Sequence, residues 1–137
     1  MRYFCLILSL ILGLSTSVSA DSTENYLCIE EASTGFHFEN GGWKSSKFKE
    51  YKFLVKVEKG STYNKDVTIT KFGDESPTFF PENCKVYATN IRCASVFGQF
   101  KMGTRDDNLN FLNAYTYGFV EKNYDTPTIG IGSCAKM

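Results

Sequence analysis

The residues best suited to chemistry in this chain are its five cysteines. Cys5 lies in an apolar N-terminal segment, and the others follow it as Cys28, Cys84, Cys93 and Cys134. An even number of cysteines in a short exported chain indicates disulfide bonds, because compartments outside the cytosol allow such bonds to persist. Zinc or redox sites need closer pairs, and no two cysteines here are nearer than nine positions. The cysteines therefore predict two structural disulfides, with no metal and no cofactor.

Four cysteines allow three pairings. Cys84 and Cys93 are close enough to clip a local hairpin, which leaves Cys28 and Cys134 to join the first and last strands. We favour this pairing, although the sequence leaves the other two open. In the chain-entropy model the long bridge contributes about 5 kcal/mol and the short one roughly 2.5 kcal/mol.

His37 is the only histidine, so any acid–base or hydrolytic scheme based on imidazole must use it. It alternates with Phe36 and Phe38 in a predicted strand, so inward phenylalanines would put His37 in solvent. No Gly-x-Ser-x-Gly motif marks a nucleophilic serine. We expect a surface histidine and no catalytic residue, and the sequence favours a protein that is not an enzyme.

Other polar and aromatic residues have simpler interpretations. Asp106 and Asp107 stand in a polar turn and lack the alternating ligands of a calcium loop. Trp43 either fills the core beside a glycine turn, which we favour, or anchors a partner. Phe79 and Phe80 lie between two prolines, and adjacent residues of an extended segment cannot both enter one core. These three aromatic residues are the candidate partner-binding residues, chiefly Phe79 and Phe80 in an irregular loop over 74–83.

The N-terminal segment and the net charge of the chain indicate the compartment in which the protein acts and the partners to expect. Residues 1–20 combine Arg2, an apolar run too short to span a membrane, and a small-residue exit at Ala20, which together predict a cleaved signal peptide. We expect residues 21–137 to form one domain, periplasmic or secreted, with no membrane span. The chain has 15 basic and 15 acidic residues, so loss of Arg2 leaves a charge near −1, which argues against a nucleic-acid partner.

Strands must position these residues, because helical periodicity is nearly absent. We predict an all-β fold, an antiparallel meander of about eight strands that forms a small barrel or sandwich held by the disulfides. A hairpin turn is expected at 39–42, where Asn40 precedes Gly41. The predicted strands cover 26–30, 34–38, 43–48, 51–57, 67–72, 85–88, 93–102, 109–120 and 128–134.

Three of these strands have informative faces. Segment 51–57 has one apolar face, made of Tyr51, Phe53, Val55 and Val57. Segment 109–120 has an apolar face on which Asn113 is the polar exception. Segment 128–134 alternates glycine with isoleucine, so one side is nearly bare and lets another backbone or a bulky aromatic approach closely.

The two ends of the chain also carry a recognisable pattern. It runs Cys28, Thr34-Gly35-Phe36-x-Phe38, Trp43, Phe48 and Tyr51-x-Phe53, and closes with Gly118-Phe119, Thr126-Pro127 and Ile131-Gly132-x-Cys134. This pattern resembles a group of small uncharacterised exported proteins of proteobacterial and phage-like genomes, over nearly the whole chain after the leader. The resemblance implies a bacterial or phage source and brings no activity. Inhibitors of c-type lysozymes are also small exported barrels, but their Ser-Gly-x-x-Tyr signature is missing here.

These observations predict an exported binding or interaction module whose partner is a protein or a small ligand outside the cytosol. The alternative is an inhibitor of an envelope-directed enzyme such as a lysozyme, presenting the loop over 74–83. A hydrolase using His37 is the third possibility. A cavity inside a barrel would favour a small apolar ligand, a projecting loop would favour inhibition, and a polar cleft around His37 would favour catalysis.

Overall fold

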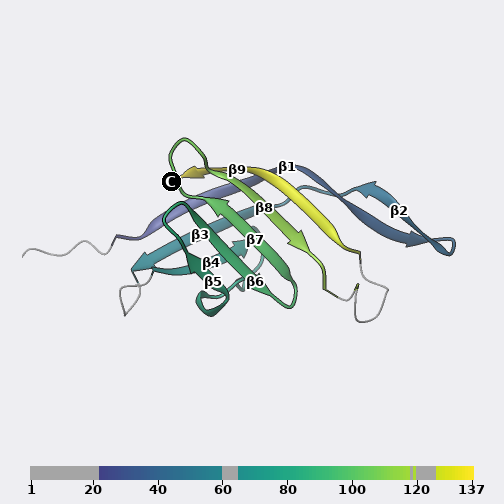
Figure 1. Ribbon diagram of the computed structural model, residues 1–137, viewed down its shortest axis with the longest axis horizontal. Coiled ribbons are helices and arrows are strands. Elements are labelled where there is room, and N and C mark those ends of the chain that lie inside the picture. The colour runs from purple at the N-terminus through teal and green to yellow at the C-terminus, as the bar shows by residue number, and fades with distance from the viewer. Residues whose placement is uncertain (1–21, 60–64, 118, 120–125) are drawn as a thin grey trace, which may run out of the picture.

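The computed structural model describes residues 22–59, 65–117, 119 and 126–137. The predicted signal peptide, its cleavage near Ala20, and Cys5 lie outside the described residues. The described part is all-β, as predicted. Its elements are β1 (Glu24–Glu39), β2 (Gly42–Lys47), β3 (Lys52–Lys59), β4 (Lys65–Lys71), the 3₁₀ helix η1 (Pro81–Asn83), β5 (Cys84–Val86), β6 (Asn90–Ser95), β7 (Gly98–Gly103), β8 (Asn110–Tyr115) and β9 (Thr128–Lys136) (Figure 1).

The strands form one antiparallel sheet that curls into a nearly closed barrel (Figure 1). Its order is β4-β3-β1-β9-β8-β7-β6-β5, and β2 pairs with the end of β1 off this path. The first and last strands are therefore neighbours, and β4 and β5 are the two edges that approach one another. The sequence left a barrel and a sandwich as the two alternatives. Because the curled sheet surrounds a single interior, the architecture is the barrel.

The first strand is longer than predicted, because the segments 26–30 and 34–38 belong to one continuous strand of 16 residues. One edge of β1 pairs with β9, while its other edge pairs first with β3 and then with β2. A bulge between Glu30 and Ala32 changes which side chains face inward. As a result Glu30 faces the interior before the bulge, and Ser33 and Gly35 face it afterwards.

The hairpin between β1 and β2 projects beyond the barrel (Figure 1). Its turn lies where the sequence predicts it, with positive φ angles at Asn40 (51°) and Gly41 (78°). Positive φ at both central residues matches the right-handed twist of the two strands, and asparagine and glycine are the residues that adopt it most easily.

The predicted strand over 93–102 is wrong, because the chain reverses between β6 and β7. The turn residues Val96 and Phe97 are apolar, so they carry no turn signal, and Val96 is 73 % exposed. Gly98 follows with φ of 153°, and a Cβ there would lie 1.9 Å from the Ala114 carbonyl oxygen. Cross-strand pairing, rather than local composition, sets this turn. The predicted strand over 109–120 likewise ends earlier, at Tyr115.

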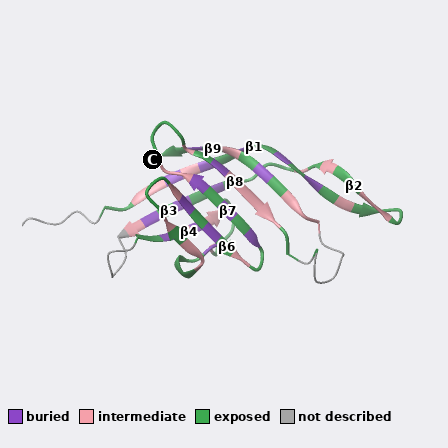
Figure 2. Ribbon diagram, viewed as in Figure 1, coloured by how far each residue is buried: buried purple, intermediate pink, exposed green. Residues whose placement is uncertain are grey.

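The apolar core fills the half of the barrel farther from the hairpin (Figure 2). The predicted inward face of β3 is confirmed at Phe53, Val55 and Val57, which are buried, whereas Tyr51 lies just before the strand and is partly exposed. The rings of Phe53, Phe100 and Phe111 contact one another. The remaining buried apolar residues are Tyr26, Cys28, Val67, Ile69, Phe79, Ile91, Cys93, Met102 and Cys134.

Candidate functional site

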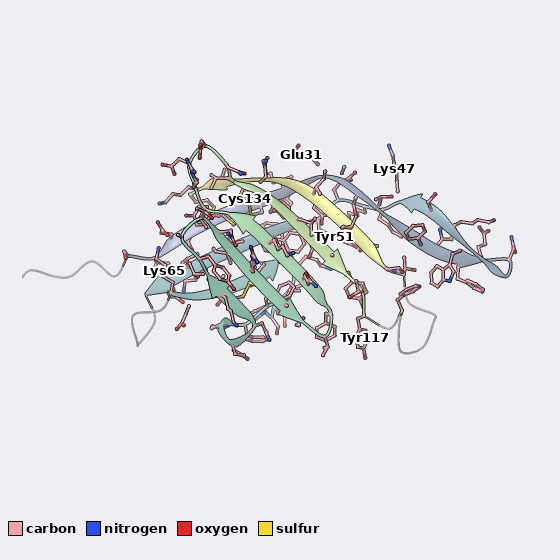
Figure 3. All side chains as sticks on the ribbon, viewed as in Figure 1. Glu31, Lys47, Tyr51, Lys65, Tyr117 and Cys134 are labelled. Atoms are coloured by element: carbon pink, nitrogen blue, oxygen red, sulfur yellow. A yellow bond between two sulfur atoms is a disulfide. The ribbon has the colours of Figure 1, made fainter. Side chains whose placement is uncertain are left out.

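The other half of the barrel is hollow. A cavity of about 1300 Å³ opens at the end where β3, β7 and β9 begin and β4 and β8 end. This mouth lies toward the projecting hairpin, where Tyr51 and Tyr117 are labelled, and away from Lys65 and Cys134 (Figure 3). Seven of the described residues that line the mouth cavity are aromatic, namely Phe48, Tyr51, Phe53, Phe79, Phe80, Phe97 and Tyr115.

One wall of the mouth cavity is the loop between β4 and η1. Phe79 pairs with Ile69 of β4 in an isolated antiparallel bridge, which lays the loop along the open edge of the barrel. The ring of Phe79 enters the core and is 2 % exposed, and the next residue, Phe80, points outward and is 45 % exposed. The two phenylalanines were not expected to enter the core together, and only Phe79 does so. The loop packs against the barrel instead of projecting from it.

A buried carboxylate lies behind the floor of the mouth cavity. Glu30 is 4 % exposed, and its side chain accepts a hydrogen bond of 2.8 Å from the backbone amide of Tyr51. The amide of Asn113 donates a second, longer bond of 3.4 Å. Both donors line the cavity, so the carboxylate lies directly behind its polar lining. The main chains of residues 30 and 51 are also joined, since the amide of Glu30 donates to the carbonyl of Tyr51.

Gly130 makes room for this carboxylate. A Cβ at Gly130 would lie 2.1 Å from Oε1 of Glu30, closer than any side chain could approach. The bare side of β9, which we expected to admit a backbone or an aromatic ring, therefore admits a carboxylate at this position. At Gly132 the expectation holds, because a Cβ there would meet the Ile29 carbonyl oxygen.

Burial is the main influence on the charge of Glu30. Loss of solvent raises the pKa of its carboxyl group, and nearby Glu50 raises it further, while the hydrogen bonds from Tyr51 and Asn113 act in the opposite direction. No cation contributes to this pKa among the described residues. The carboxylate is therefore hydrogen-bonded but has no counter-charge, which is a costly state for a buried anion.

Trp43 lies apart from the cavity, on the projecting hairpin. It is half-buried, and its ring packs edge-on against Phe38 at 5.4 Å and Phe119 at 5.1 Å between centroids. The prediction that Trp43 fills the core is wrong, because the hairpin extends beyond the barrel and its aromatic residues pack on one another. Of the three candidate aromatic residues, the structure places Phe79 and Phe80 at the cavity and leaves Trp43 outside its lining.

His37 occupies the opposite face of the same hairpin, which is polar. Its Nε2 lies 3.4 Å from Glu39, whose carboxylate also accepts a bond of 3.2 Å from Lys44. These two contacts lower the pKa of the exposed Glu39 carboxyl group. His37 is beside a carboxylate but is not part of the mouth cavity, so the condition for a hydrolytic cleft is not met around it.

The disulfides join Cys28 to Cys134 and Cys84 to Cys93, the pairing that the positions of the cysteines favour. The first bridge links β1 to β9 near the filled end of the barrel, and the second links β5 to β6. Asp106 and Asp107 lie in the turn between β7 and β8, where Asp107 pairs with Arg105. Within the described ranges, no three His, Cys, Asp or Glu side chains are placed to hold a metal ion together.

Glu30 is not among the residues predicted from the sequence. It continues the alternation of Tyr26 and Cys28 before the bulge of β1, so it faces inward with these two buried residues. That alternation is the signal that could have found it. A partial signal exists in Asn113, the polar exception on an apolar face, opposite the glycine-rich strand 128–134. Asn113 is predicted only as the exception on an apolar face, and the bare side of 128–134 predicts the close approach of a backbone or an aromatic ring, so neither feature predicts the carboxylate.

The fold and the cavity define the class of protein, an antiparallel β-barrel with two disulfides and one hollow end. Comparisons with family models, with curated proteins and with solved structures find no match for this chain. No helix in the part of the chain that the structure describes is long and apolar enough to cross a membrane. The two disulfides and this finding are compatible with a protein that acts outside the cytosol.

Proposed function

We propose that the protein is an exported binding module that holds a small, largely apolar ligand in the mouth cavity. The observation that carries this proposal is a cavity of about 1300 Å³ lined by seven aromatic residues. Binding sites for small molecules are concave, mostly apolar and largely preformed, with a few polar groups that orient the ligand. Barrels of eight strands are wide enough to hold one such ligand. Asn113 and Glu30 would be the orienting groups here.

An apolar fluorescent dye tests this proposal. N-phenyl-1-naphthylamine is expected to bind the purified protein, with its disulfides intact, and to gain fluorescence on leaving water. Thr128→Trp should weaken dye binding and reduce the gain, because Thr128 lines the cavity and a bulky ring there occupies part of the mouth. Ile129→Trp is the matched control, because Ile129 is the next residue of β9 and is 42 % exposed on the outer face. Unchanged dye binding in Thr128→Trp, with its circular dichroism spectrum preserved, would refute the proposal.

A second candidate function is contact with a protein partner through the hairpin. Inhibition of an envelope-directed enzyme such as a lysozyme would be one example of such contact. The observation in its favour is the aromatic face of the hairpin. Phe36 and Phe38 are 52 % and 51 % exposed, and they lie on the same side as Trp43. Exposed aromatic residues that gather on one face are typical of binding hot spots.

Inhibition of a c-type lysozyme by the purified protein tests this second function directly. Trp43→Ala should weaken inhibition at least tenfold, because it removes the centre of the aromatic face. Lys44→Ala should leave inhibition within twofold, because Lys44 lies on the opposite, polar face of the hairpin. Absence of inhibition by the unaltered protein would exclude lysozyme as its target.

A further inference from the structure

The charge distribution around the mouth cavity is one-sided. Among the described residues that line the cavity, Lys71 is the only lysine, arginine or histidine, whereas both Asp74 and Glu75 are acidic. The ammonium of Lys71 lies 3.9 Å from the carboxylate of Asp74, so this cation already has a partner. Glu75 at the cavity wall and Glu30 behind its floor have no basic residue paired with them in the described ion pairs. The cavity is therefore complementary to positive charge.

The aromatic lining has the same preference. The faces of phenylalanine and tyrosine rings carry negative potential and attract cations held within about 6 Å. The mouth cavity already shows one such contact, because Nζ of Lys71 lies 4.5 Å from the centre of the Tyr51 ring. Further rings, among them Phe53 and Phe97, line the same space. Aromatic walls with a carboxylate nearby are the arrangement that recognises amines and quaternary ammonium groups.

The position of Glu30 gives the site a polar end. Tyr51 and Asn113, whose backbone amide and side-chain amide donate to Glu30, both line the cavity, so the carboxylate lies directly behind residues that a guest would contact. A cation there would supply the counter-charge that this buried anion lacks. An anionic group at the same place would lie near the negative charge of Glu30 and would be repelled.

We infer that the ligand of the mouth cavity is an organic cation, an amine or ammonium compound with an apolar body, and that Glu30 selects its charged end. This inference rests on the proposed function and adds the chemical class of the ligand. The apolar body packs against the aromatic walls, and the cationic end lies over the floor beside Asn113. Glu30 acts here as a specificity-determining residue.

Three probes that share a benzyl group test the inference. Benzyltrimethylammonium is a cation, neopentylbenzene is its neutral isostere, and phenylacetate is an anion of similar size. Each is titrated into the isotopically labelled protein, with both disulfides formed, and binding is followed by shifts of the amide resonances. We expect the cation to bind at least tenfold more tightly than the neutral isostere, and the anion to bind most weakly. The shifted resonances should include those of Tyr51 and Asn113.

A pair of isosteric variants locates the selectivity. Glu30→Gln keeps an oxygen for the Tyr51 amide but removes the charge, so the cation should lose about tenfold in affinity while the neutral isostere binds as before. Glu31→Gln is the matched control, since Glu31 is exposed and binds Ser133 on the outer surface, and it should retain the preference for the cation.

The outcomes separate the inference from the proposed function. Equal binding of the cation and its neutral isostere would overturn the inference and leave the apolar binding function in place. A preference for the cation that survives Glu30→Gln would overturn the role of Glu30. Failure of all three probes, together with failure of the apolar dye, would overturn the proposed function itself. The series measured on the unaltered protein decides the ligand class even if Glu30→Gln does not fold.

Discussion

The bridge between Cys28 and Cys134 is expected to stabilise the fold far more than the bridge between Cys84 and Cys93. Replacing both residues of the long bridge by alanine should lower the free energy of unfolding by about 4.8 kcal/mol, since the sequence separation is 106 residues. The same replacement at the short bridge, with a separation of 9, should cost about 2.6 kcal/mol. The expected difference is thus about 2 kcal/mol.

The structure makes the two double replacements directly comparable and adds a second expected difference between them. Each bridge joins residues that face one another in neighbouring antiparallel strands, so each double replacement removes two sulfur atoms from equivalent positions. Without its bridge, β9 is still paired on both edges, with β1 and β8. By contrast, β5 has only three residues and pairs only with β6 in the described sheet, so it can open alone. Local opening would reduce the measured global loss below 2.6 kcal/mol for the short bridge.

Urea unfolding at pH 7, followed by circular dichroism and by the fluorescence of the single tryptophan, measures both losses. Limited proteolysis reports local opening, and cleavage near β5 should increase only in Cys84→Ala/Cys93→Ala. Equal losses from the two double replacements, or a larger loss at the short bridge, would refute the reasoning. Such a result would mean that the bridges act mainly through contacts in the folded state instead of restricting the unfolded chain.

Three further perturbations address the floor and the wall of the cavity. Gly130→Ala should lower the free energy of unfolding in urea by about 2–3 kcal/mol, because its Cβ displaces the Glu30 carboxylate from its hydrogen bonds. Gly42→Ala is the control, since a Cβ at Gly42 would have open space around it, and it should cost under about 0.5 kcal/mol. Equal costs of the two replacements would contradict this geometry. The pKa of Glu30 is raised in the folded state, so the stability from this group is present below its unfolded pKa and is lost as pH rises through the folded value. Glu30→Gln should therefore gain stability relative to the unaltered protein between pH 4 and pH 7, and a difference independent of pH would refute this. Phe79→Ala should cost about 3–5 kcal/mol and Phe80→Ala under about 1 kcal/mol in the same unfolding assay, and similar costs would contradict their different burial.

Features encoded by neighbouring residues were predictable from the sequence. The alternation at Phe53, Val55 and Val57 predicts a strand with one buried face, and the structure buries all three. The Asn40-Gly41 turn was predictable because few other residues accept positive φ at both positions. Both signals act over two to four residues, so they need no knowledge of the partner strands.

Features that depend on partner strands were missed. The turn after β6 lies at apolar Val96 and Phe97, because pairing of β6 with β7 fixes it there. The prediction that Trp43 fills the core beside the glycine turn is wrong, because its hairpin extends past the end of the barrel. In the candidate site, Phe79 and Phe80 were found from their prolines and adjacency, while Glu30 was not found.

The sequence by itself predicted the class of this protein, an all-β chain with two bridges whose cysteines favour one pairing; the export signal that it also predicts lies outside the described residues. These properties follow from composition, from side-chain alternation and from the spacing of a few residues, all of which are local. Only the tertiary structure decided that the barrel is hollow at one end and that a carboxylate lies beneath the floor of this cavity. The physical reason is the register of β1 against β9, which places the inward-facing Glu30 beside Gly130, whose missing side chain leaves space for the carboxylate. Residues 100 positions apart in the chain set that register, and no local pattern contains it.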